Sequence, residues 1–182
     1  MPDQNHNAFT ADSLFLTLRL ARHGDDLLIR HIDALRNAMR RVLRNYPMEI
    51  DAIVVLPAVI HTLWTLPQGD KKGPNRIRML KSRFSRAVPF PDYRTPEQIK
   101  RGDKGIWQGS YWAFPVRDRS TFDRHRDLIH LSPVRAGLCT RPQDWPHSSI
   151  HRDIARGLAT PRLATPVPTD KAGARHTDLI LQ

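Results

Sequence analysis

The sequence predicts an α/β fold in which helices pack on one face of an antiparallel sheet. Two observations support this prediction. Within the apolar segment 50–56, residues 53–56 form a short β-branched and aliphatic run that stops at Pro57, and a second run covers residues 59–66, which is typical of two strands joined by a tight connection. Residues 26–45 and 76–88 repeat apolar side chains every three or four positions, as amphipathic helices do.

The remaining elements complete a regular order along the chain. Residues 14–20 are an apolar segment that we expect to be the first strand, and the aromatic-rich residues 106–114 are expected to be the fourth. A third helix is predicted to begin with Ser120 as its cap and to loosen or end before Pro133. A short further helix is expected within residues 144–157. The resulting βαββαβ order, with an extra C-terminal helix, is the ferredoxin-like or RNA-recognition-like topology.

We predict one folded domain over residues 13–157 with a tail on each side. Residues 1–12 are polar and are expected to be flexible. Residues 158–182 contain several prolines and little periodicity, which is typical of disorder. Within the domain, residues 89–105 are rich in proline, glycine and charge, so we expect a loop that orders on binding.

The chain is strongly basic. Its 182 residues include 29 lysines and arginines against 18 aspartates and glutamates, a formal net charge of +11. Such an excess favours a polyanionic partner, because neutralising phosphates releases counterions. The single cysteine, Cys139, excludes an intramolecular disulfide and a cysteine-based zinc site. A polar N-terminus and the lack of a long apolar stretch argue against secretion and membrane insertion, so we expect a cytoplasmic protein.

Cations concentrate on the predicted second helix, which carries no acidic residue. We interpret its surface as a nucleic-acid contact that follows phosphates, although a charged helix face also commonly serves solubility. Aromatic residues of the predicted fourth strand either stack on bases or fill the core. The candidate nucleic-acid-binding residues are Arg76, Arg78, Lys81, Arg83, Arg86, Trp107 and Tyr111.

Several short motifs lie in one collinear order through the predicted domain. They are residues 49–57, 80–86, 105–108, 111–112, 129–130, 133–138 and 144–149, and they include the sequences GIWQ, PVRAGL and DWPHSS. Together they resemble the REP-associated tyrosine transposases of the IS200-like, single-tyrosine HUH group. So many matching segments make chance similarity improbable.

The resemblance implies a metal-dependent nuclease and strand-transferase that recognises single-stranded or hairpin DNA at repeated extragenic palindromes. It also implies three chemical parts. A His-hydrophobic-His triplet on a central strand holds one divalent metal, a helical tyrosine attacks the scissile phosphate, and an Asn or Gln four residues later is a further ligand. These parts are chemically coherent, because the metal stabilises developing charge and a four-residue spacing puts two side chains on one helix face.

All three parts differ in this chain. Val59 stands at the first histidine of the triplet and His61 at the second, and a valine has no lone pair to offer a metal. Leu128 stands at the tyrosine position, and Ser132 stands where the family has asparagine. We therefore expect no intact catalytic residue, with Leu128 as the degenerate nucleophile position.

His61 has two interpretations. It is either a strand histidine satisfied by local partners, which we favour, or a remnant metal contact shared with His130. No cofactor is expected under the first interpretation, and Mg²⁺ or Mn²⁺ would be needed only if activity is retained. A substitute nucleophile would have to be Tyr46, Tyr93 or Tyr111, the only tyrosines of the chain.

The leading hypothesis is a transposase-like DNA-binding protein that binds single-stranded or hairpin DNA and is catalytically inactive. One alternative is an active, metal-dependent single-strand DNA transposase or nuclease that uses a displaced tyrosine. The other is an RNA-binding regulator, because the same topology and charge suit single-stranded RNA.

Overall fold

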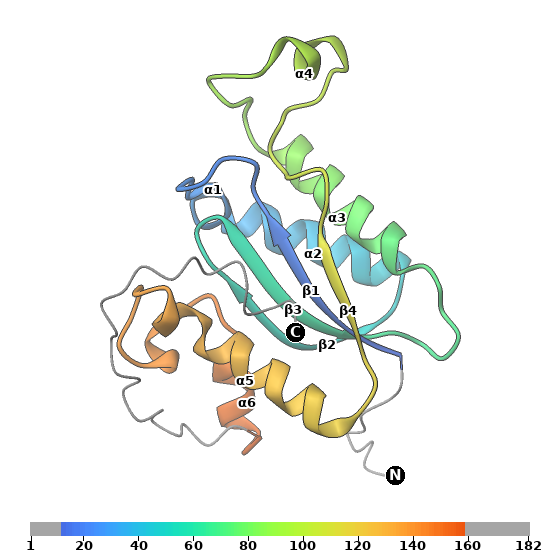
Figure 1. Ribbon diagram of the computed structural model, residues 1–182, viewed down its shortest axis with the longest axis vertical. Helices are drawn as coiled ribbons and strands as arrows, with labels where there is room; N and C mark the ends of the chain where they lie inside the picture. The colour runs from blue at the N-terminus through green and yellow to red at the C-terminus, as the bar shows by residue number, and fades with distance from the viewer. Residues whose placement is uncertain (1–11, 159–182) are drawn as a thin grey trace.

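The computed structural model describes residues 12–158. Four antiparallel strands form one sheet in the order β2-β3-β1-β4 (Figure 1). The strands are β1 (Ser13–Arg19), β2 (Glu49–Val55), β3 (Val59–Thr65) and β4 (Trp112–Val116). The predicted α/β fold, an antiparallel sheet with helices packed against it, is confirmed. The predicted tails, residues 1–11 and 159–182, lie outside the described residues.

Three helices lie on one face of the sheet: α1 (Leu27–Arg30), α2 (Ile32–Asn45) and α3 (Gly73–Ala87). On β1, Leu16 and Leu18 point toward them and join a fully buried apolar core with Leu80 and Phe84 of α3. The expectation of one continuous helix over residues 26–45 was wrong, because His31, with φ −118° and ψ 38°, interrupts it.

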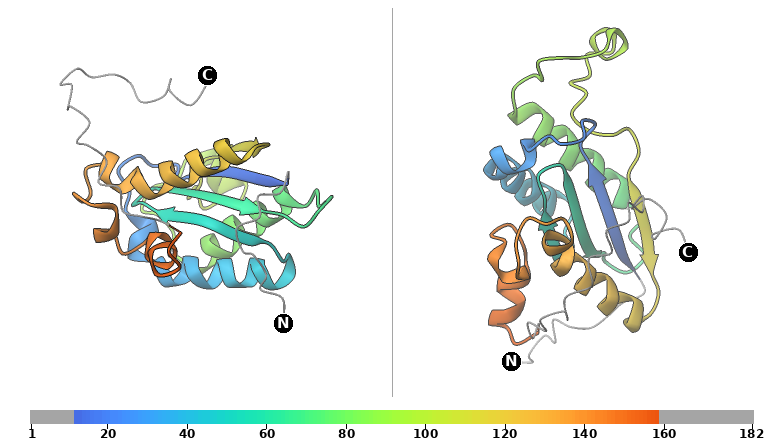
Figure 2. Two further views of the ribbon diagram at one scale, coloured as in Figure 1. Left: turned by 90° about the horizontal axis from the view of Figure 1, so that it is seen from below. Right: turned by 60° about the vertical axis from the view of Figure 1, so that its left-hand side comes forward.

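The third long helix, α5 (Arg119–Arg135), packs on the opposite face of the sheet (Figure 2, left). Side chains alternate along a strand, so Phe15 of β1 and Leu63 of β3 point away from α3 and meet Phe122 and Ile129 of α5. The sheet therefore separates two apolar cores, which we call the α3 core and the α5 core.

The outer edge of β2 is covered by the segment that precedes α6 (Ile150–Ala155). Val55 N donates to His147 O at 2.9 Å, and Ser149 N donates to Ile53 O at 2.8 Å. The indole of Trp145 also donates to Val55 O at 2.9 Å. A 3-10 turn (Pro142–Asp144) leads into this segment. These bonds satisfy the backbone of an edge strand that would otherwise be open to pairing.

The predicted fourth strand was placed too early. β4 begins at Trp112, and Trp107 makes only an isolated bridge to Leu20. The physical reason is that the Trp107 ring packs against Phe84 at a centroid distance of 5.4 Å, on the α3 side. The aromatic run is thus divided between a core contact and a strand at Gly109.

The start and end of α5 also differ from expectation. Asp118, not Ser120, is the N-cap, and its carboxylate accepts from Thr121 N at 2.8 Å. The helix continues through Pro133 to Arg135. Ser132 and Pro133 are both buried, so packing against the sheet overrides the local preference to stop.

The expected loop at residues 89–105 forms an arm that projects beyond α3 (Figure 1). It contains α4 (Pro96–Lys100), which starts with a reciprocal capping box between Thr95 and Gln98. Lys104 Nζ donates to Val88 O at 2.6 Å and fastens the arm to the end of α3. The arm is therefore ordered by its own bonds.

Arg76 is a structural residue, and its prediction as a phosphate contact was wrong. Its side chain is 1% exposed and pairs with Asp70 at 2.8 Å. The same guanidinium donates to Pro47 O at 2.8 Å and to Tyr46 O at 3.4 Å. Arg76 thereby ties α3 to the connection between α2 and β2, and its donors face protein acceptors.

Replacement of Arg76 by alanine should lower the free energy of unfolding by about 2–4 kcal/mol, because buried carbonyl oxygens lose a charged donor. Urea denaturation measures this change. Arg78→Ala, on the exposed side of the same helix, is the matched control and should cost less than about 0.5 kcal/mol. Equal effects of the two substitutions would contradict a structural role for Arg76.

Candidate nucleic-acid interface

His61 lies in the middle of the sheet face that α5 partly covers. In the strand register it stands opposite Thr17 on β1 and opposite Val54 on β2. Its Nδ1 is 2.9 Å from Thr17 Oγ1, and its ring lies parallel to that of Phe15 at a centroid distance of 6.1 Å. Burial, together with the nearby positive charge of Arg19, lowers the pKa of His61 to about 4. The imidazole is therefore neutral at pH 7.

The other positions of the family's chemical centre are occupied by packing residues. Val59 and Leu128 both pack against the α5 core, and the hydroxyl of Ser132 donates to Leu128 O at 2.7 Å. A divalent metal needs several N or O ligands, and this set offers one imidazole and one hydroxyl already committed to a carbonyl. The residues present do not fit the metal that the family chemistry implies. Within residues 12–158 no group of three or more His, Cys, Asp or Glu side chains is arranged to hold a metal ion.

All three tyrosines lie away from the His61 face. Tyr46 follows α2 and faces the Arg76 guanidinium at 5.5 Å from its ring centroid. Tyr93 is in the arm and is 70% exposed. Tyr111 precedes β4, and its ring lies 5.6 Å from Lys81 Nζ on the α3 side of the sheet. None of them stands where Leu128 does.

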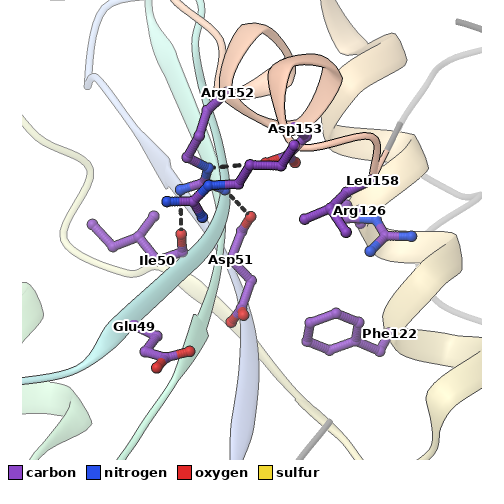
Figure 3. A pocket seen from close by; sticks show the side chains of 9 residues that line it. Glu49, Ile50, Asp51, Phe122, Arg126, Arg152, Asp153 and Leu158 are labelled. Atoms are coloured by element: carbon purple, nitrogen blue, oxygen red, sulfur yellow. Dashed lines mark hydrogen bonds and ion pairs between the residues drawn. The ribbon is translucent and has the colours of Figure 1, made fainter. Parts of the chain in front are cut away.

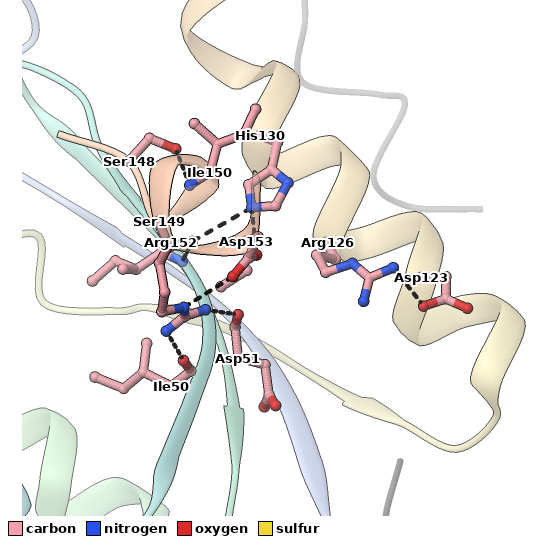
Figure 4. A network of polar contacts seen from close by, with 12 residues as sticks. Ile50, Asp51, Asp123, Arg126, His130, Ser148, Ser149, Ile150, Arg152 and Asp153 are labelled. Carbon is pink, nitrogen blue, oxygen red and sulfur yellow. Dashed lines mark hydrogen bonds and ion pairs between the residues drawn. The ribbon is translucent and has the colours of Figure 1, made fainter. Parts of the chain in front are cut away.

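His130 belongs to a buried joint and does not share a site with His61. Its Nε2 lies 3.1 Å from Asp153 Oδ2 and 3.4 Å from Ser149 Oγ (Figure 4). Arg152 pairs with the same carboxylate at 2.9 Å and donates to Ile50 O at 2.8 Å. Burial acts to raise the pKa of Asp153, but the contacts from His130 and Arg152 outweigh it and hold the pKa below its usual range. The joint fixes α5 and α6 to β2.

A pocket of about 220 Å³ adjoins this joint (Figure 3). Carboxylates and guanidinium groups share its wall, and burial raises the pKa of Asp51. It is lined by Glu49, Ile50, Asp51, Phe122, Arg126, Arg152, Asp153, Arg156 and Leu158. Sequence reasoning missed this pocket, because its residues come from three distant segments and share no motif.

Three of the five cations predicted on α3 line one groove, which we call the α3 groove. Arg78, Arg83 and Arg86 surround a volume of about 360 Å³ beside Tyr46. None of the three forms an ion pair with a carboxylate in the described part of the chain, residues 12–158. The Nε of Arg83 is buried there without a hydrogen-bond partner. Guanidinium groups that lack a carboxylate partner are suited to phosphate oxygens.

Lys81, Trp107 and Tyr111 meet at a separate place, at the junction of α3 and the segment before β4. Lys81 Nζ donates to Gln108 O at 2.9 Å and lies 6.0 Å from the Trp107 ring centroid. Burial lowers the pKa of Lys81. The Trp107 indole donates to Lys81 O at 3.2 Å, so its ring is held in packing, whereas Tyr111 is 37% exposed. Of the two predicted stacking residues, Tyr111 presents more of an open surface.

None of the helices between residues 12 and 158 has the length and apolar character that a membrane span requires.

Comparison with known proteins identifies relatives over most of the chain. No protein-family model matches it. It is 37% identical over 161 residues to the REP-associated tyrosine transposase of Escherichia coli, covering 88% of this chain and 90% of that protein. It is 35% identical over 148 residues to a Haemophilus influenzae protein named for the same family, covering 80% and 84%.

A solved structure of a REP-associated tyrosine transposase bound to a REP hairpin superposes with a TM-score of 0.75 at 34% identity. The match covers 96% of this chain and 98% of that one. The similarity thus spans the sheet, α3, the arm, α5 and α6. The resemblance noted in the sequence is confirmed, and the chain belongs to the REP-associated tyrosine transposases.

Proposed function

We propose that this protein binds DNA hairpins with single-stranded flanks and does not cleave them. The observation that carries the proposal is the placement of Val59 and Leu128 in the α5 core, where the family chemistry needs a metal ligand and a nucleophile. Support for the ligand comes from the related transposase that was solved bound to a REP hairpin. Binding and chemistry use different residues, so one can persist without the other.

The α3 groove is the proposed phosphate contact. Arg78, Arg83 and Arg86 bring three unpaired guanidinium groups to one surface, and the net charge of +11 adds attraction at longer range. Lys81 and Tyr111 lie at the other side of α3 and are proposed as secondary contacts, whereas Trp107 supports them by packing. Arg76 is not included.

His61 is proposed to be a structural histidine. Its Nδ1 bond to Thr17 and its stacking on Phe15 give it local partners, and His130 is engaged elsewhere. A single neutral imidazole is a poor site for Mg²⁺, which prefers oxygen ligands in octahedral geometry. No cofactor is proposed. Mg²⁺ or Mn²⁺ would be required only if cleavage activity were retained.

The triple variant Arg78→Gln/Arg83→Gln/Arg86→Gln should weaken hairpin binding and reduce the slope of log K against log salt concentration by about 2–3, because each lost phosphate contact removes about 0.9 of slope. Filter binding at several salt concentrations measures the slope. Hairpins of one sequence made of DNA and of RNA should be compared in the same assay, and tighter binding of the RNA would favour the regulator hypothesis.

The matched control is Arg36→Gln/Arg40→Gln/Arg41→Gln, which removes the same charge from the exposed side of α2. It should leave most of the slope intact. If both triple variants lost equal slope, binding would depend on net charge alone and the α3 groove would have no special part.

Restoring the family residues tests the chemical half of the proposal. Val59→His/Leu128→Tyr/Ser132→Asn should cut an end-labelled hairpin in the presence of Mn²⁺, because it returns a second imidazole, a hydroxyl nucleophile and an amide ligand. Denaturing gels measure the cut strand. The control Val59→His/Leu128→Phe/Ser132→Asn has the same aromatic bulk at residue 128 without the hydroxyl and should not cut.

Both variants must first be shown to fold and to bind the hairpin, since His and Tyr enter an apolar core. A restored variant that is folded and bound but does not cut would show that these three positions do not account for the loss of activity.

A further inference from the structure

Two aromatic rings of β4 lie on the same sheet face as His61. In the β1–β4 register Trp112 stands opposite Thr17, and Phe114 stands opposite Phe15. Residues directly opposite in an antiparallel pair share a face, and Thr17 is in turn opposite His61. The backbone of Trp112 is therefore two strand spacings, about 10 Å, from that of His61.

These rings are open to solvent because of where α5 lies. β4 is an edge strand, and α5 lies mainly over β2 and β3. Trp112 is 38% exposed and Phe114 is 39% exposed, which is unusual for large rings on a face that is elsewhere buried. We call this pair the β4 platform.

A side chain of α5 packs against the β4 platform. The His125 ring of α5 stacks on Phe114 at a centroid distance of 5.4 Å and an angle of 24°, and it contacts Phe15 at 4.6 Å. His125 Nδ1 donates to Thr121 O at 2.8 Å, which fixes the orientation of the imidazole. Phe114 is thus supported on one side and exposed on the other, so little order has to be gained on binding.

One cation, Arg19, lies on the same sheet face as the β4 platform. Arg19 lies two residues beyond Thr17 on β1 and therefore on the same face, and its charge is felt by His61. Exposed aromatic faces next to a cation suit unpaired nucleotides, since a base can stack and its phosphate can meet the guanidinium. Bases within a duplex are already stacked on one another and do not present their faces.

On the basis of the proposed hairpin binding, we propose that Trp112 and Phe114 stack on unpaired bases of the single strand that flanks the hairpin. The β4 platform would then hold the strand that leads to the family's chemical centre.

The test compares affinities for one hairpin in three forms: without tails, with single-stranded tails on both ends, and with tails of abasic nucleotides. For the tailed hairpin, Trp112→Ala should weaken binding on the order of 5- to 100-fold, the range for loss of one base–aromatic stack. The affinity of the Trp112→Ala variant for the hairpin without tails should match that of the unmodified protein. Trp112→Phe should recover most of the loss. Hairpins with abasic tails keep the phosphates but offer no base to stack, so Trp112→Ala should not weaken their binding.

Tyr93→Ala removes an even more exposed ring from the arm and serves as the control that should change nothing. An equal loss for tailed and tail-less hairpins, no loss at all, or tighter binding by Trp112→Ala would each overturn the platform. Failure of the unmodified protein to bind any form of the hairpin would instead overturn the proposed function.

Discussion

The packing of α5 against the sheet determines the character of the whole site. Phe122 and Ile129 of α5 meet Phe15 and Leu63 in an apolar core. Residues at positions 59 and 128 pack against this core and are partly buried, so an apolar side chain there gains part of the free energy of complete burial. Under the proposed function, the two residues that stand in place of a metal ligand and a nucleophile are the ones that extend the apolar contact between helix and sheet.

One group of polar residues on this side of the molecule forms a structural joint. His130, Asp153 and Arg152 connect α5, α6 and the edge of β2 through charged hydrogen bonds. Breaking a buried network of this kind is costly, because loss of one partner leaves a buried charge uncompensated.

Much of the fold followed from local pattern. The strand at residues 59–66 was placed within one residue of β3, because a β-branched run bounded by prolines is a clear strand signal. The strand before it was placed at residues 53–56, whereas β2 begins four residues earlier at Glu49, because Asp51 interrupts the apolar pattern there. The aromatic run before β4 was misplaced, since composition cannot tell a ring that packs on Phe84 from a ring that lies in a strand.

The site was less predictable than the fold. Arg76 and Arg78 are two residues apart on a basic helix, and only the positions of Asp70 and of the carbonyl of Pro47 make one structural and leave the other exposed. Likewise, the partner of His130 is 23 residues away at Asp153, and no spacing rule connects them. The exposure of Trp112 depends on which strands α5 covers, which is a property of the assembled sheet.

The central claim is that DNA recognition has outlasted the chemistry, and one reaction analysed in two ways tests it. The full chain is incubated with Mn²⁺ and an end-labelled DNA hairpin that carries single-stranded tails, and the products are run on a native gel and on a denaturing protein gel. The account predicts a retarded complex on the native gel and intact, protein-free DNA after denaturation. Shortened DNA, or label that stays on the protein after denaturation, would contradict it.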